Sequence, residues 1–181
     1  MEILSAASAS WRLIFVIVAT LQHIPTIRRA GIHDAIKLRK LASYEINESP
    51  PALSWWLQQI KRQPSNCWLI MEARGTRSAL GFIRLKDLAE SHGLPARQHV
   101  SLFAIHKKFR RQGHGTRLLS YALQCLDAEG ACCVSLFVRP SNEGAKRLYE
   151  RLGFVPHTRV LSYYTADGED ALLCVRWRTR R

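Results

Sequence analysis

The sequence predicts an α/β fold with about seven strands and about four helices, and three observations point to it. Short apolar runs bounded by turn residues alternate with segments of helical periodicity. The apolar strand Val100–Ile105 passes through a glycine turn directly into an amphipathic helix. The chain has 181 residues, 47% of them apolar, which suits one well-cored domain. We therefore expect a single domain over residues 24–181, preceded by an N-terminal extension, residues 1–23.

The extension holds an apolar run, Trp11–Leu21, that contains Arg12. This run is shorter than the roughly 20 residues that a membrane helix requires. A signal peptide would need a positive first region, whereas Glu2 is negative. We expect an additional helix or strand, or a partly disordered extension, and no membrane association. The five cysteines form no C-x-x-C pair, which favours a reducing compartment and a cytoplasmic protein.

The elements of the domain follow from periodicity and turn residues. The first helix should turn Ile36, Leu38 and Leu41 inward, and prolines at the start of the second helix suit its first turn. The predicted helices are Ile32–Leu41, a helix from the prolines at 50 and 51 to about Arg62, a helix beyond Thr116 that extends to Leu126, and Asn142–Leu152. The predicted strands are Ile24–Arg28, Cys67–Glu72, Ala79–Leu85, Val100–Ile105, Cys132–Val138, Phe154–Tyr163 and Ala171–Trp177, with a loop over Ala89–Arg97.

The glycine turn Gly113-His114-Gly115 is the strongest candidate for a binding site. The first N–H groups of a helix lack partners within the helix, and the helix dipole adds positive charge there, so the turn suits a phosphate. A Walker motif needs a longer glycine spacing followed by Lys-Ser/Thr, and a dinucleotide fingerprint needs a third glycine where Arg117 or Leu118 stands. A tight turn surrounded by solvated charges remains the alternative.

Two segments resemble the GNAT superfamily of acetyltransferases. Arg110–Gly115 resembles its Arg/Gln-x-x-Gly-x-Gly/Ala motif, and Pro140–Phe154 resembles its second signature, Asn-x-x-Ala-x-x-Leu-Tyr-x-x-x-Gly-Phe. The resemblance runs from about Ile24 to about Trp177. It implies the GNAT fold, with a central mixed, mostly antiparallel sheet, and an N-acetyltransferase that uses acetyl-CoA as acyl donor.

The resemblance also implies residues that hold acetyl-CoA. Backbone groups of Phe103, Ala104 and Ile105 should pair with the pantetheine arm. The pyrophosphate should lie on the amides of Arg111, Gln112, Gly113, His114, Gly115 and Thr116, with charge added by Arg110 and Arg111. Asn142 is expected to cap its helix and to contact the coenzyme. Tyr149 should lie beside the coenzyme sulfur and act as general acid, since a phenol stays protonated at neutral pH; a core tyrosine is the alternative.

The general base and the acceptor are less defined by the resemblance. His99 is a candidate base, because it lies fourteen residues before Gly113, where histone-type GNAT enzymes carry a glutamate. Phe137 replaces the glutamate of the ribosomal-protein alanine acetyltransferases, so a water chain or Glu143 remains open as the base.

The acceptor has clues at both ends of the chain. Tyr163-Tyr164 and Gly168–Leu172 resemble the acceptor-groove segment of the ribosomal-protein alanine acetyltransferases. The region Leu41–Met71, which contains Ser54–Leu57, resembles GNAT enzymes that act on nucleotide-linked amino sugars and other small amines. Tyr44, Trp55 and Trp56 are either pocket residues or core aromatics. We expect a primary amine as acceptor and prefer a protein α-amine over a small amine; a non-catalytic acyl-CoA-binding regulatory module is the alternative class.

Charge and histidine spacing limit the other partners. The 27 Lys and Arg against 14 Asp and Glu give a formal charge of +13, yet the basic residues are scattered and lack interleaved aromatics. This indicates a general preference for polyanions and no specific nucleic acid. The seven histidines show no ligand spacing, so we expect no metal. A monomer or a homodimer fits the sequence equally well.

Overall fold

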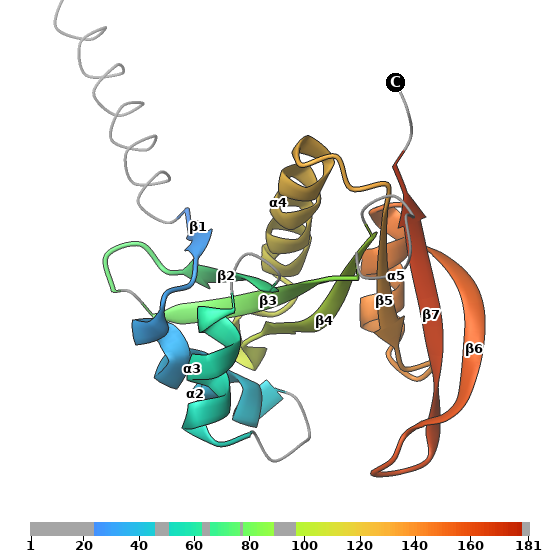
Figure 1. The fold of residues 1–181 in the computed structure, drawn as a ribbon, viewed down its shortest axis with the longest axis horizontal. Coiled ribbons are helices and arrows are strands. Elements are labelled where there is room, and N and C mark those ends of the chain that lie inside the picture. Colours follow the sequence, from blue (N-terminus) through green and yellow to red (C-terminus); the bar gives the residue numbers. More distant parts are fainter. Residues whose placement is uncertain (1–23, 46–50, 63–65, 77, 89–96, 179–181) are drawn as a thin grey trace, which may run out of the picture.

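A computed structural model describes residues 24–45, 51–62, 66–76, 78–88 and 97–178, and Figure 1 shows their arrangement. The extension 1–23 and most of the predicted loop 89–97 lie outside the described residues. The strands are β1 (Thr26–Arg29), β2 (Asn66–Glu72), β3 (Ala79–Asp87), β4 (Arg97–Ile105), β5 (Cys133–Val138), β6 (Val155–Tyr164) and β7 (Glu169–Trp177). The α-helices are α2 (Ala35–Glu45), α3 (Leu53–Lys61), α4 (His114–Ala128) and α5 (Glu143–Arg151), with short 3-10 turns η1 (Ile32–Asp34) and η2 (Lys107–Phe109).

The strands form one mixed sheet in the order β1-β2-β3-β4-β5-β7-β6. Every neighbouring pair is antiparallel except β4 with β5, which run parallel because α4 crosses between them. The seven strands and four α-helices of the described residues confirm the predicted fold class.

Helices cover both faces of the sheet, so the core has two layers (Figure 1). The strand period of two separates them: Ile83 and Leu85 pack toward α4 and α5, whereas Phe82 packs toward α2 and α3. All five apolar positions on one side of α4 are buried: Leu118, Leu119, Ala122, Leu123 and Leu126. A binding site that reaches both faces of the sheet therefore requires an opening between two strands.

The prediction that Ile36 faces inward is wrong, since its side chain is 65% exposed. The buried face of α2 is formed by Ala35, Leu38, Leu41 and Ala42. Ile36 and Leu38 are two residues apart in α2 and therefore lie about 200° apart around the helix axis, so Ile36 faces solvent when Leu38 is buried.

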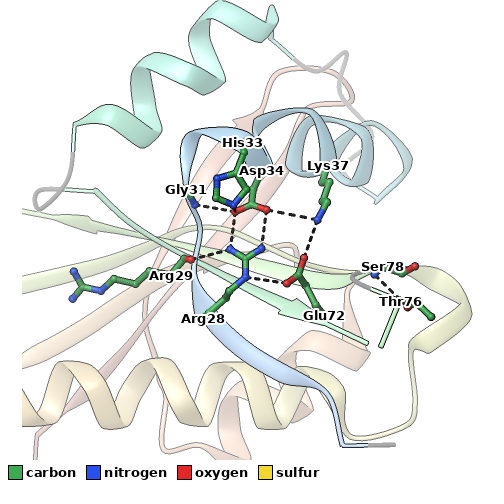
Figure 2. A network of polar contacts seen from close by, with 9 residues as sticks. All are labelled: Arg28, Arg29, Gly31, His33, Asp34, Lys37, Glu72, Thr76 and Ser78. Carbon is green, nitrogen blue, oxygen red and sulfur yellow. Dashed lines mark hydrogen bonds and ion pairs between the residues drawn. The ribbon is translucent and has the colours of Figure 1, made fainter. Parts of the chain in front are cut away.

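An ion-pair network fixes β1 and α2 to β2 (Figure 2). Arg28 donates to both oxygens of the fully buried Asp34 carboxylate, at 2.7 and 2.8 Å, and its Nε donates to Glu72 at 2.9 Å. Lys37 donates to Glu72 at 2.9 Å, and the Gly31 N–H donates to Asp34 at 2.9 Å. This bidentate arrangement anchors the first strand of the sheet.

None of the described helices is long and apolar enough to cross a bilayer.

Candidate active site

The sheet opens between β4 and β5. The two strands pair over four residues, from Arg97 with Cys133 to Val100 with Leu136, and no further pairing follows along their described residues. A bulge leaves Ser101 of β4 without an opposing residue on β3, because Arg84 faces Leu102 while Leu85 faces Val100. Bulges bend a strand and increase its twist. Beyond the bulge, Phe103–Ile105 therefore present a strand edge on which an extended ligand can lie.

The turn before α4 lies just beyond this edge. Gly113 is the N-cap of α4 with φ +79°, and Arg111 also has a positive φ, +62°. Left-handed residues in such a turn point successive N–H groups into one concavity that suits an anion. A Cβ on Gly115 would lie 3.4 Å from Leu148 and 3.6 Å from Phe103, which are ordinary van der Waals distances, so α4 begins close to both β4 and α5.

Side chains around the turn have their own partners. Arg110 Nε donates to the Ile105 carbonyl at 2.9 Å, and Gln112 Nε2 donates to the Lys108 carbonyl at 3.1 Å. Arg111 Nη1 lies 3.9 Å from the place that a Cβ on Gly144 would take, so it reaches the start of α5. His114 and Thr116 are half-buried in the first turn of α4. Burial and the charge of Arg117 lower the pKa of His114.

Helix α5 brings Tyr149 to the opening. Asn142 caps the helix, since its side-chain oxygen accepts the Ala145 N–H at 3.1 Å. The Tyr149 ring lies between Phe103 and Phe154, with ring centroids 6.4 and 5.9 Å away. Burial, with smaller contributions from Tyr164 and Cys174, raises the pKa of the Tyr149 hydroxyl well above its usual range. The phenol therefore keeps its proton at any physiological pH.

His99 lies on the other face of the sheet. In β5, Leu136 and Val138 pack toward α4 and α5, so Ser135 and Phe137 point to the side of α2 and α3. His99 Nδ1 lies 3.0 Å from Ser135 Oγ, and its ring meets Phe137 at 5.4 Å. Burial and the charge of Lys86 lower the pKa of His99. The imidazole is therefore neutral at pH 7 and can accept a proton.

The β6–β7 hairpin brings both predicted acceptor tyrosines to this region. The Tyr163 ring stacks on Phe137 with centroids 4.5 Å apart, and Tyr163 meets Tyr164 edge to face at 5.1 Å. Arg139 lies 3.7 Å over the Tyr164 ring and forms ion pairs with Asp167 and Glu169. Sequence reasoning did not single out Ser135 or Arg139, whose partners are distant in sequence. The alternation of β5 could have placed Ser135 beside Phe137.

Other predicted residues lie elsewhere. Trp56 is 1% exposed and packs on Trp68 and Phe82. It therefore lies in the core, the second of the two positions expected for it, and does not line the surface of a groove. The side chain of Tyr44 is outside the described residues. Glu143 is exposed and pairs with Lys146, whose hydrogen bond lowers the pKa of the Glu143 carboxyl. No group of three or more metal-ligating side chains occurs in the described part of the chain.

Comparison with known proteins gives consistent relatives. The acetyltransferase (GNAT) family model matches residues 32–154. The catalytic subunit NAA20 of the N-terminal acetyltransferase B complex of Arabidopsis thaliana is 30% identical over 148 residues, which are 81% of this chain and 82% of that protein. An N-alpha-acetyltransferase of Sulfurisphaera tokodaii is 32% identical over 155 residues, 81% of this chain and 89% of that protein.

Among solved structures, the ribosomal-protein-S18-alanine N-acetyltransferase from Escherichia coli has the same fold. It is 22% identical, with a TM-score of 0.74, and the match covers 87% of this chain and 96% of that chain. The resemblance carried by Arg110–Gly115 and Pro140–Phe154 is thus confirmed at the level of the family. The chain belongs to the acetyltransferase (GNAT) family, and it is an N-acetyltransferase.

Proposed function

We propose that this enzyme transfers the acetyl group of acetyl-CoA directly to the α-amine of a protein N-terminus. The observation that carries the proposal is the opening between β4 and β5. It links the anion-binding turn of α4 and Tyr149 on one side with the aromatic group His99, Phe137 and Tyr163 on the other. Donor and acceptor can thus approach from opposite faces and meet at the opening.

Acetyl-CoA fits the donor side. The amides from Arg111 to Thr116 would hold its pyrophosphate, and the edge at Phe103, Ala104 and Ile105 would pair with its pantetheine arm. The positive φ of Gly113 supports this assignment. So does the edge beyond the bulge in β4, which pairs with no described strand on the β5 side, although the Ile105 carbonyl already accepts Arg110 Nε. Asn142 and Arg111, both near the start of α5, would add contacts.

Transfer requires one bond to form and one to break. The acceptor nitrogen forms a bond to the acetyl carbon, and the bond between that carbon and sulfur breaks. The nitrogen gives up a proton, and the departing thiolate takes one. Tyr149 is the proposed donor of that second proton, because its raised pKa keeps the phenol protonated and proton transfer of this kind contributes about 10²–10⁴ in rate.

His99 is the proposed acceptor of the first proton. Its lowered pKa keeps it neutral, and Ser135 fixes the ring through Nδ1. Glu143 is less suited, because the Lys146 ammonium stabilises its ionised form and its side chain is exposed. A water molecule between His99 and the amine could relay the proton, and His99 would remain its acceptor.

Two observations favour a protein N-terminus over a small amine as the acceptor. Tyr163 and Tyr164 flank the opening, and the relatives from Arabidopsis thaliana and Sulfurisphaera tokodaii are named as N-terminal or N-alpha-acetyltransferases. The small-amine alternative was based on the segment around Trp55-Trp56, and Trp56 lies in the core.

The test is thiol release from acetyl-CoA by the full chain. Acceptors are peptides with a free α-amine, the same peptides with a blocked terminus and a free lysine, and small amines that include a nucleotide-linked amino sugar. We expect turnover of free α-amines. Tyr149→Phe should lower kcat by about 10²–10⁴ with little change in KM for acetyl-CoA.

Tyr121→Phe is the matched control. Tyr121 lies on the exposed side of α4, 39% accessible, and loses the same hydroxyl without touching the opening. Turnover of small amines alone would refute the proposed acceptor. Tight binding of acetyl-CoA without turnover of any amine would point instead to a non-catalytic regulatory module.

A further inference from the structure

Strand β6 contains a bulge next to the acceptor tyrosines. Val160 faces Ala171 and Tyr164 faces Glu169, so four steps along β6 correspond to two along β7. Ser162, inside the bulge, has φ +48°. A residue with a Cβ adopts this left-handed conformation only when its surroundings hold it there.

The carboxylate of Asp170 spans this bulge. One oxygen accepts the Ser162 N–H at 2.8 Å, and the other accepts Arg159 Nε at 2.6 Å. The side chain of Asp170 is 18% exposed, so water competes little for these bonds. Asp170 therefore binds the backbone at the left-handed residue and a side chain that precedes it on the same strand.

The bulge determines where Tyr163 points. Successive strand residues face opposite sides of a sheet, so a change of one residue in register would turn Tyr163 away. In the structure, Tyr163 instead stacks on Phe137 at 4.5 Å, and Phe137 meets His99 at 5.4 Å. A chain of contacts thus joins Asp170, through Ser162 and Tyr163, to the proposed base.

We infer that Asp170 is a positioning residue for acceptor binding: by holding the bulge at Ser162 it keeps Tyr163 stacked on Phe137 as one wall of the acceptor groove. This inference rests on the proposed function, because it assigns the wall to the acceptor. Asp170 itself touches neither acceptor nor donor. The proposed donor site lies mainly on other elements, the edge of β4 and the starts of α4 and α5, so we expect it to stay in place when the bulge relaxes.

The kinetic test compares Asp170→Ala with Asp170→Asn and Arg159→Ala. We expect Asp170→Ala to raise the acceptor KM by about tenfold, which corresponds to about 1.4 kcal/mol of lost acceptor binding, while KM for acetyl-CoA stays unchanged. Asp170→Asn keeps an oxygen for the Ser162 N–H and should restore most of the affinity. Arg159→Ala keeps Asp170 on Ser162 and should change the acceptor KM by less than Asp170→Ala does.

A double-mutant cycle checks that the effect passes through Tyr163. Once Tyr163→Ala has removed the ring, adding Asp170→Ala should raise the acceptor KM little further. Additive effects of the two substitutions would overturn the inference. So would equal rises of KM for acceptor and for acetyl-CoA, which would indicate a general loss of structure.

A spectroscopic readout separates this inference from the proposed function. In protein labelled with fluorotyrosine, Tyr163→Phe identifies the Tyr163 signal, whose shift reports its stacking on Phe137. Asp170→Ala should move that signal and Asp170→Asn should leave it nearly in place. An unmoved signal in Asp170→Ala would overturn the positioning role whatever the activity. If the wild type acetylates no peptide and Asp170→Ala still moves the Tyr163 signal, the proposed function is refuted and the positioning role of Asp170 is not.

Discussion

At the scale of single residues, burial holds both proposed proton-transfer groups in their neutral forms. Burial raises the pKa of the Tyr149 phenol, because the charged form is the phenolate. Burial lowers the pKa of His99, because the charged form is the imidazolium, and the Lys86 charge adds to this. Each side chain is therefore in the neutral form that its proposed role requires near pH 7.

The lowered pKa of His99 predicts the pH dependence of kcat. With acceptor saturating, kcat reports the enzyme–substrate complex, so the acceptor's own ionisation contributes less than it does to kcat/KM. As pH falls through the pKa of His99, which lies below its ordinary value of 6.5, the imidazole becomes protonated and kcat should fall. His99→Gln should lower kcat at neutral pH and remove this acidic limb.

His157→Gln is the control, since His157 is an exposed residue of β6. It should leave the profile of kcat unchanged. An acidic limb that persists in His99→Gln would place the base elsewhere, on a water chain or another group.

Residues of the site differed in how far the sequence could identify them. Asn142 stands three residues before the Ala145 N–H that it caps, so the expected cap could be predicted from local spacing. His99 and its partner Ser135 are 36 residues apart. No local pattern joins two residues on neighbouring parallel strands, so this contact required the structure.

At the scale of elements, α5 provides a test that separates helix stability from ligand contact. Asn142 accepts the Ala145 N–H at 3.1 Å, and loss of such a cap costs about 0.5–2 kcal/mol. Asn142→Ala should therefore lower the free energy of unfolding by about 1 kcal/mol, measured by urea titration, and should raise KM for acetyl-CoA.

Asn142→Asp is the matched variant. Its carboxylate still caps α5, so stability should stay near wild type, yet it lacks the amide donor and adds negative charge beside the proposed phosphates. KM for acetyl-CoA should rise in this variant as well. A normal KM in both variants would remove Asn142 from the donor site and leave it as a cap.

The elements were predicted well where periodicity was strong and less well at their ends. The apolar face of α4 and the strands β2 and β5 follow the expected patterns. The side of α2 that faces the core was misassigned at Ile36, because Ile36 stands two residues before Leu38 and so lies on the opposite side of the helix. The bulge in β6 could not be predicted from the sequence either, because its left-handed residue is Ser162 and not a glycine.

At the scale of the whole molecule, the network around Asp34 predicts how stability depends on pH. Although burial opposes ionisation, hydrogen bonds from Arg28 and Gly31 lower the pKa of Asp34 from 3.8 to about 2. Its stabilising contribution is therefore present above about pH 4 and is lost as pH falls toward 2. Asp34→Asn should lower the free energy of unfolding at pH 7 by about 1–3 kcal/mol, because it leaves donors of Arg28 without an ionised acceptor.

Urea titrations at several pH values check this expectation. The difference between wild type and Asp34→Asn should shrink as pH falls below 4, where the wild-type carboxylate begins to lose its charge. Glu129→Gln is the control, since Glu129 forms an exposed ion pair with Arg29 at 3.4 Å and such pairs contribute about 0–1 kcal/mol. A difference that stays constant down to pH 2 would show that the charge of Asp34 is not what stabilises the fold.

The architecture as a whole could be predicted because two signatures in the right order resemble one family. The contacts that hold it could not, since Arg28 and Glu72 are 44 residues apart and opposite charges at that separation are common in any chain. The contact between Arg139 and Glu169 could not be predicted for the same reason, because the two residues meet only when β5 and β7 are paired.

The short parallel contact between β4 and β5 has a consequence for cohesion. It divides the sheet into two antiparallel parts, β1-β2-β3-β4 and β5-β7-β6, joined by four residue pairs. A molecule that contacted both parts along this junction would act as a brace between them. Because binding to the folded state alone adds to its stability, acetyl-CoA in the proposed site would also hold the two halves of the sheet together.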